Sequence, residues 1–150
     1  PGCIWPDDKR IESAYQKYRS QLSVETFEHL FGVYGARAVE LLSLIDEHPD
    51  LAQRLIPTHP NIRAEVVFAM QQEMAHNLLD FTRRRKVLAM NANYGYDVLE
   101  PILETLRQHC GWDEDKCQRE TAAYKQFMEG NCIPYYVLSA DAETRSLQAV

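Results

Sequence analysis

The sequence has few glycines and no long apolar run. These two shortages exclude a glycine-rich nucleotide-binding loop and a membrane-spanning helix, respectively. Six glycines occur in 150 residues, and no arrangement of them makes the G-x-G-x-x-G or Walker loop that cradles nucleotide phosphates. The longest unbroken apolar run is the five residues Val66–Met70, far short of the ~20 that a membrane-spanning helix needs. Sixteen Lys and Arg against twenty-two Asp and Glu give a formal charge of −6. This balance argues against a nucleic-acid partner, because phosphate contacts need a basic face.

Cysteine is also scarce. The four cysteines, at positions 3, 110, 117 and 132, are widely spaced and form no C-x-x-C pair. A disulfide scaffold would be denser, and a zinc site would use closer pairs. We therefore predict reduced, structural thiols and a reducing, cytosolic compartment.

The chain opens on Pro1-Gly2 without a charged-then-apolar leader. We therefore expect these residues to be a loop cut from a longer protein, and we expect no secretory signal.

What the sequence does contain is helical periodicity. With 45% hydrophobic and 25% charged residues, the composition is typical of one globular domain. Apolar residues recur at three- and four-residue steps between Pro and Gly punctuation. The expected helices cover 7–21, Ser23 to the break at Gly32–Gly35, 36–47, 62–86, Asp97 or Glu100 to Gly111, and Asp113 to Gly130.

Only residues 133–138 resemble a strand, and they are few and contain Pro134. A short Pro-containing segment of this kind is more typical of coil or of a sheet edge. We predict an all-α fold, a compact domain of about six or seven helices without a substantial sheet.

Segment 62–86 carries the most information. A buried face is predicted by apolar residues at helical steps: Val67, Met70, Met74, Leu78 and Phe81. The opposite, solvent-facing side would then hold Glu65, Gln72, Glu73, His76, Asp80 and Arg83. One long helix fits this spacing. Two helices with a break near His76 fit it as well, because Asn77 followed by Asp80 resembles a helix N-terminus.

Two local patterns bear on chemistry. Glu73-Met-Ala-His76 is an E-x-x-H, the spacing with which di-iron bundles present two ligands, but the chain has no second copy. We therefore interpret it as part of the polar face and predict no metal ligands. Arg83-Arg84-Arg85-Lys86 could hold a phosphate, an anionic lipid surface or an acidic domain. It could equally be a solvated helix end in which Asp80 pairs with Arg84.

Several motifs, in order along the chain, resemble one family. They are Leu30-Phe-Gly-Val-Tyr-Gly-Ala-Arg37, Ile62-Arg-Ala-Glu-Val-Val-Phe-Ala69, Glu73-Met-Ala75, Asp80-Phe-Thr-Arg-Arg84 and Gly111-Trp-Asp113. The resemblance is to the C-terminal helical domain of the FAD-dependent, aerobic-type glycerol-3-phosphate dehydrogenases and the related glycerophosphate oxidases. It runs from Pro1 to about Asn131.

The resemblance implies domain limits and a parent enzyme. Residues 1–131 would be the C-terminal helical domain, with 1–6 the linker from the flavin domain, and 132–150 a weakly ordered tail. The parent would oxidise sn-glycerol 3-phosphate to dihydroxyacetone phosphate, with FAD and substrate bound upstream of this domain. The fragment itself would then hold no cofactor and no catalytic residue. The parent would be cytoplasmic and attached to the inner membrane face only peripherally.

We accordingly expect an accessory domain whose partner is the upstream FAD and substrate domain of the same chain, with a homo-oligomer as a further expectation. The candidate interface is Glu65, Glu73, Asp80, Arg83 and Arg84. The other motif residues are expected to be structural: Tyr34, Gly35, Arg37, Trp112 and Asp113. The alternative is a stand-alone helical protein-interaction module, whose likeness to the family comes from shared helical patterning.

Overall fold

The all-α prediction is confirmed. The computed structural model describes residues 9–86, 88–90, 93–134 and 137. Its helices are α1 (Lys9–Tyr18), α2 (Val24–Tyr34), α3 (Ala38–Glu47), α4 (Arg63–Gln72), α5 (Leu99–His109) and α6 (Glu114–Asn131). Short 3-10 turns cover Gly35–Arg37, Pro49–Ala52, Leu88–Met90 and Tyr96–Val98, and a π-helical turn covers Asp80–Arg85.

Among these residues there is no strand, only an isolated antiparallel bridge between Arg54 and Ile62. None of the described helices combines the length and the apolar character that a bilayer crossing requires.

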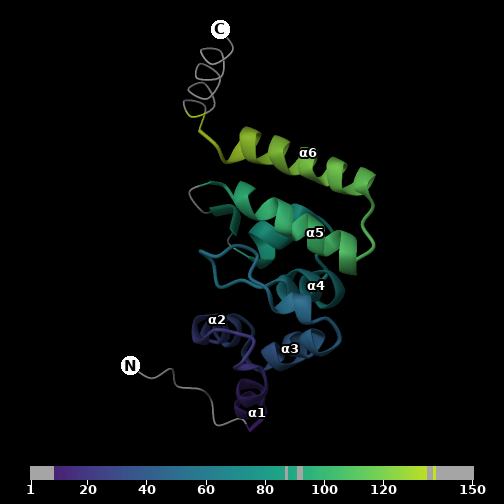
Figure 1. Cartoon of the computed structure of the whole chain (residues 1–150). Coiled ribbons are helices and arrows are strands. Elements are labelled where there is room, and N and C mark those ends of the chain that lie inside the picture. The colour runs from purple at the N-terminus through teal and green to yellow at the C-terminus, as the bar shows by residue number, and fades with distance from the viewer. Residues whose placement is uncertain (1–8, 87, 91–92, 135–136, 138–150) are drawn as a thin grey trace.

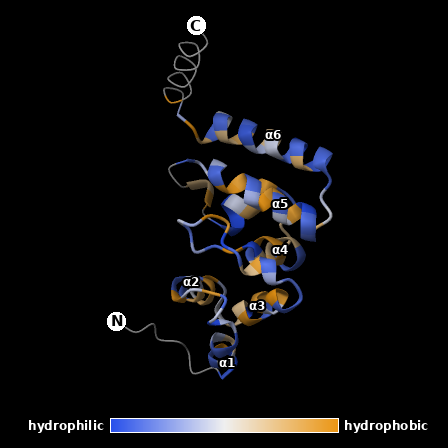
Figure 2. Cartoon of the chain, in the orientation of Figure 1, coloured by the Kyte–Doolittle hydropathy of each residue, from blue (hydrophilic) through white to orange (hydrophobic). Residues whose placement is uncertain are grey.

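The helices are stacked, with α1 and α6 at opposite ends and α4 in the middle (Figure 1). α4 packs on α3 on one side and on α5 on the other, α1 packs on α3, and α6 packs on α5. Apolar residues concentrate on α2 to α5, whereas α6 is mostly hydrophilic (Figure 2). The central helix is therefore the one element that both halves of the stack share.

Buried apolar residues form two cores, one on each side of α4. Ala64, Val67 and Phe68 belong to the core with α1, α2 and α3. Val66 and Ala69 belong to the core with α5 and α6. At about 100° per residue these two sets lie on opposite faces of one helix, so α4 has no broad solvent-facing side.

Most helix ends lie where their capping residues predict them. The Ser23 hydroxyl accepts the Thr26 N–H at the start of α2, and the Asp113 carboxylate accepts the Lys116 N–H at the start of α6. The second helix is longer than expected. α2 continues through Gly32 to Tyr34 and ends at Gly35, whose φ of 56° suits a residue without a Cβ.

The break near His76 is confirmed. α4 ends at Gln72, and the next helical residues are capped by Asn77, whose Oδ1 accepts the Asp80 N–H at 2.8 Å. Between them the Ala75 N–H donates to the Ala69 carbonyl six residues back, one residue further than in a Schellman ending. Met74 occupies the left-handed position of this ending, with φ 56°.

Some expectations fall on residues that the structure does not describe. They concern the linker at 1–6, Cys3, positions 135–136 and the tail from 138 onward. Cys110, Cys117 and Cys132 are described and are free thiols.

Candidate functional site

Glu65 is a carboxylate in the first turn of α4 with no exposed surface. Ile62, the residue before the helix, has no polar side chain to cap it. The Glu65 Oε1 atom supplies that cap by accepting the Ile62 N–H at 3.0 Å. A buried charge is tolerated only when it is paired and hydrogen-bonded, so the surroundings of Glu65 matter for the whole domain.

Three further side chains reach Glu65 from two directions. From α2, His29 Nε2 lies 3.2 Å from both carboxylate oxygens and the Tyr34 hydroxyl donates to Oε2 at 3.2 Å. From the residue pair before α4, Asn61 Nδ2 donates to Oε1 and Oε2 at 3.2 and 3.3 Å. The carboxylate therefore fastens α2 to the beginning of α4.

The counter-charge comes from Lys86. Its Nζ lies 2.5 Å from Glu65 Oε2, and the lysine side chain is only 4% exposed. The same ammonium donates to the Tyr34 hydroxyl and lies 3.9 Å from the centre of that ring. This buried ion pair, with Tyr34 against it, joins the chain after the π-helical turn to α2 and α4.

The π-helical turn helps to bring Lys86 inward. The Lys86 N–H donates at 2.8 Å to the Phe81 carbonyl, five residues back rather than four. This wider turn holds one more residue than an α-turn. Arg83, Arg84 and Arg85 remain exposed, whereas Lys86 is buried.

The electrostatics of the cluster favour a structural role at neutral pH. Burial alone would raise the pKa of Glu65, but the His29 hydrogen bond and the charge of Lys86 outweigh it and hold that pKa below its ordinary value. Burial, and then the Glu65 charge, raise the pKa of Tyr34, so its hydroxyl keeps its proton and donates. The carboxylate oxygens already accept several donors, which suits a clamp better than a general base.

Two predicted interface residues are not at the surface. Glu65 has no exposed area and Asp80 is 7% exposed, which corrects the expectation that both lie on a solvent-facing side. The reverse holds for Met74, which was expected in the buried face and is 74% exposed. The physical reason is that α4 is covered on both sides and ends before Met74, so one helical face cannot extend across 62–86.

Asp80 holds the turn between α4 and the π-helical segment. Its carboxylate accepts the His76 N–H at 3.0 Å and Arg84 Nη1 at 2.6 Å, so the expected Asp80–Arg84 pair is confirmed. Burial would raise the pKa of Asp80, but these two donors keep it below its usual range.

The other interface candidates, Glu73, Arg83 and Arg84, lie nearer the surface. Arg83 stacks over the Phe127 ring of α6 at 5.1 Å and its Nη1 lies 3.2 Å from Cys132 Sγ. Glu73 is half-buried and lies 3.6 Å from Arg37 Nη1. Arg84 remains largely exposed beyond its contact with Asp80.

The motif residues expected to be structural make internal contacts. Tyr34 binds the Glu65 cluster, and Gly35 ends α2. Arg37 stacks over the Phe68 ring at 4.9 Å. Trp112 is buried in the core beneath α6, and Lys116 lies 4.2 Å from its ring centre. Asp113 caps α6.

Sequence analysis missed three members of the cluster, namely His29, Asn61 and Lys86. One available signal was Glu65 itself, since an acidic residue three positions after an apolar helix start can serve as the cap. No periodic signal marks Lys86, because a π-helical turn departs from the spacing on which the pattern depends.

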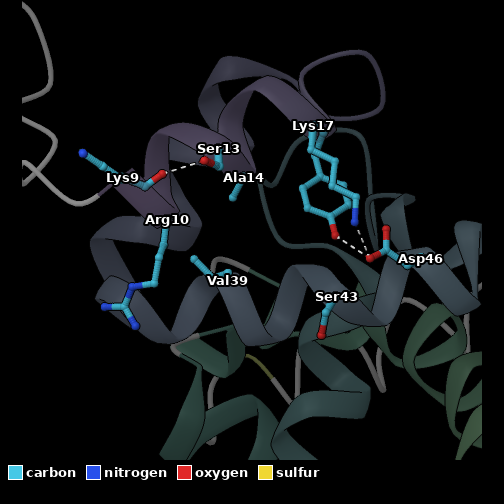
Figure 3. Close-up of a pocket in the computed structure, with 9 residues that line it drawn as sticks. Lys9, Arg10, Ser13, Ala14, Lys17, Val39, Ser43 and Asp46 are labelled. Atoms are coloured by element: carbon cyan, nitrogen blue, oxygen red, sulfur yellow. Dashed lines mark hydrogen bonds and ion pairs between the residues drawn. The ribbon is translucent and has the colours of Figure 1, made fainter.

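A groove of about 440 Å³ lies between α1 and α3 (Figure 3). Lys17 Nζ and the Tyr18 hydroxyl both donate to Asp46 Oδ2, at 2.6 and 3.0 Å. Asp46, the carboxylate that lines this groove among the described residues, is thus already paired, and the contact fastens α1 to α3. Within the described ranges, no three His, Cys, Asp or Glu side chains come together as metal ligands would.

Comparison with known proteins gives a consistent result. The family model for the C-terminal domain of alpha-glycerophosphate oxidase matches residues 2–117. A glycerol-3-phosphate dehydrogenase of Synechocystis sp. is 46% identical over 129 residues, which is 85% of this chain and 23% of that protein. No solved structure matches the chain significantly.

Animal relatives are more distant. A probable mitochondrial glycerol-3-phosphate dehydrogenase of Caenorhabditis elegans is 32% identical over 81% of this chain and 19% of its own length. The mitochondrial enzyme of Macaca fascicularis is 30% identical over 71% of this chain and 15% of its own length. The chain therefore spans less than a quarter of each of these relatives.

We predict that the Glu65–Lys86 pair stabilises the domain only as a pair. Glu65→Gln or Lys86→Met leaves a buried partner charge uncompensated, and each is expected to lower the free energy of unfolding by about 3–5 kcal/mol. The double variant Glu65→Gln/Lys86→Met removes both charges and should recover much of that loss. Urea unfolding of the 150-residue chain measures all three.

Glu114→Gln is the matched control, because it removes the same kind of charge from an exposed pair with Arg107. It should cost less than about 1 kcal/mol. A double variant as unstable as the sum of the two single ones would show that Glu65 and Lys86 do not depend on each other.

The lowered pKa of Glu65 predicts loss of stability in acid. The folded state binds a proton at Glu65 less readily than the unfolded state, whose pKa is near the ordinary value of 4.5. The contribution of Glu65 is thus complete above about pH 4.5 and disappears as the pH falls through the lower, folded-state pKa. Unfolding free energies between pH 5 and 3 should fall less steeply in Glu65→Gln, by up to about 1.4 kcal/mol per pH unit. Equal slopes would contradict this.

Proposed function

The chain belongs to the family of C-terminal domains of alpha-glycerophosphate oxidase, and we propose that it is the accessory domain of an FAD-dependent glycerol-3-phosphate dehydrogenase. The match over residues 2–117 carries this proposal, and the names of the relatives support the activity. In this proposal the whole enzyme oxidises sn-glycerol 3-phosphate to dihydroxyacetone phosphate, and FAD accepts the hydride.

The residues of this chain do not fit an FAD site. Dinucleotide binding of this type uses a glycine-rich turn between a strand and a helix, and the six glycines provide no such motif. The described residues also contain no strand to precede it. We therefore place FAD and the substrate in the part of the enzyme that lies upstream of this domain.

We propose that the domain packs on that upstream part through a docking surface formed by Arg37, Glu73, Met74 and Arg84. Arg37 and Glu73 form a pair, Met74 follows directly, and Arg84 is held near by Asp80, which also binds the His76 N–H. Contacts between domains of one chain are more polar than obligate interfaces, and Met74 adds an apolar side chain to these charged ones. Arg83, although exposed, is turned toward α6 by Phe127 and Cys132.

Met74 is the strongest single indication of this surface. Its φ of 56° is unfavourable for a residue with a Cβ, and helix endings of this kind use Gly or Asn at that position. It also exposes 74% of its area, which forgoes the benefit of burying an apolar side chain. Both costs are removed or offset if the methionine side chain enters a pocket on the upstream domain.

Location and assembly belong to the same proposal. The names of the animal relatives place those enzymes in mitochondria. Peripheral attachment of the parent enzyme to a membrane stays a prediction. The cytoplasmic side of an inner membrane and self-association of the parent stay predictions, to be checked by cell fractionation and by the mass of the native protein.

We expect the native protein that carries this domain to be a larger flavoenzyme. Captured from its source with an antibody against this domain, it should exceed the 17.4 kDa of this chain and show flavin absorbance. It should also reduce an artificial dye only when glycerol 3-phosphate is present. A colourless, inactive protein of the size of this chain would contradict the proposal and favour a stand-alone interaction module.

The docking role of Met74 predicts opposite effects in two contexts. In the 150-residue chain, Met74→Gly relieves the left-handed backbone and should raise the free energy of unfolding by about 0.5–1 kcal/mol. In the full-length enzyme the same change removes the proposed anchor, so the melting temperature or the dehydrogenase activity should fall. Differential scanning calorimetry and dye reduction measure the two effects.

Met90→Gly is the control for this experiment, because Met90 is 69% exposed but lacks a positive φ. It should slightly destabilise the chain and leave the enzyme otherwise unchanged. A rise in stability of both the chain and the enzyme carrying Met74→Gly would remove Met74 from the interface.

A further inference from the structure

The basic run Arg83–Lys86 contains one cation without an assigned contact. Arg83 is held by Phe127 and Cys132, Arg84 by Asp80, and Lys86 by Glu65. Arg85 is exposed and forms no ion pair with the side chains that the structure describes. Its guanidinium is therefore available to a molecule outside the chain.

Arg85 lines a pocket of about 400 Å³ between α2, the loop before α4 and the end of the π-helical turn. The other polar residues of the lining are His29, His59, Asn61 and Lys86. A volume of this size is typical of small-molecule sites.

The charge of this lining is opposite to that of the whole protein. Among the residues that the structure describes, every ionisable side chain of the lining is basic and none is a carboxylate, although the chain carries a formal charge of −6. Glu65 lies behind the wall without exposed area, and Lys86 compensates its charge. An anion in the pocket would thus meet the uncompensated charge of Arg85.

The donor geometry suits phosphate. A guanidinium presents parallel N–H groups that match two oxygens of a phosphate. On the opposite wall, His29 Nε2 and Asn61 Nδ2 already bind Glu65 and each other, so Arg85 supplies the phosphate contact. Asn61 is 6% exposed and its amide already binds Glu65, so its position is fixed by the cluster. The clamp that stabilises the domain also holds one wall of this pocket in place.

The rest of the lining is apolar. Val33, Pro60 and Leu88 complete the pocket, and Val33 exposes 54% of its area. These side chains offer no partner to inorganic phosphate but can contact the carbon skeleton of an ester. The geometry points to a site for a small organic phosphate, with Arg85 binding the phosphoryl group and Val33 contacting the organic part, and we propose it as a function of this domain apart from docking.

The experiment follows the imidazole signals of His29 and His59 in NMR spectra of the 150-residue chain. Phenyl phosphate is titrated at constant ionic strength and pH, with chloride as the balancing anion. We expect saturable shifts of both signals, and weaker binding of inorganic phosphate, which lacks the apolar part. Arg85→Gln should weaken the binding of phenyl phosphate about tenfold or more.

Arg119→Gln is the matched control, because Arg119 is an exposed arginine on α6 and does not line the pocket. It removes the same charge and should leave the affinity unchanged. Phenylacetate distinguishes a phosphate site from a general carboxylate site and should bind more weakly than phenyl phosphate. Shifts that do not saturate, an affinity unaffected by Arg85→Gln, or phenylacetate binding as tightly as phenyl phosphate would each overturn the proposal.

Discussion

The buried carboxylate of Glu65 is the constraint on which the middle of this domain depends. A charge without solvent must be satisfied by donors from the protein, and those donors come from α2, from the residues before α4 and from the end of the π-helical turn. These three segments cannot move apart without leaving the charge unpaired. Lys86 is held in place because it must compensate the Glu65 charge. The neighbouring Arg85, which lines the pocket beside Lys86, is positioned as a result.

The helices and their ends could be predicted because the forces that set them are local. Ser23 and Asp113 begin helices through their own side chains, and Gly35 ends one because it tolerates a positive φ. The break before the π-helical turn has a local signal as well, since Asn77 accepts the Asp80 N–H three residues on. A single sequence contains all of this information.

The faces of segment 62–86 could not be predicted, because tertiary packing sets them. Periodicity assumes one buried and one exposed side, whereas α4 is apolar toward two cores at once. Glu65 is therefore buried although it is charged. Met74 lies beyond the end of α4, with a positive φ, and is exposed. The family, by contrast, was predictable. Several short motifs in a fixed order identify it, even though the sequence does not reveal which contacts their side chains make.

The π-helical turn sets where Lys86 lies around the helix axis. If Asp80–Lys86 formed an ordinary α-helix with the same residues, Lys86 would be displaced by about 100° around that axis, away from the Glu65 carboxylate that it now contacts. Deletion of one residue within the turn would instead leave the Lys86 N–H four residues from the Phe81 carbonyl, which is the ordinary α-helical spacing, and would so keep Lys86 near Glu65.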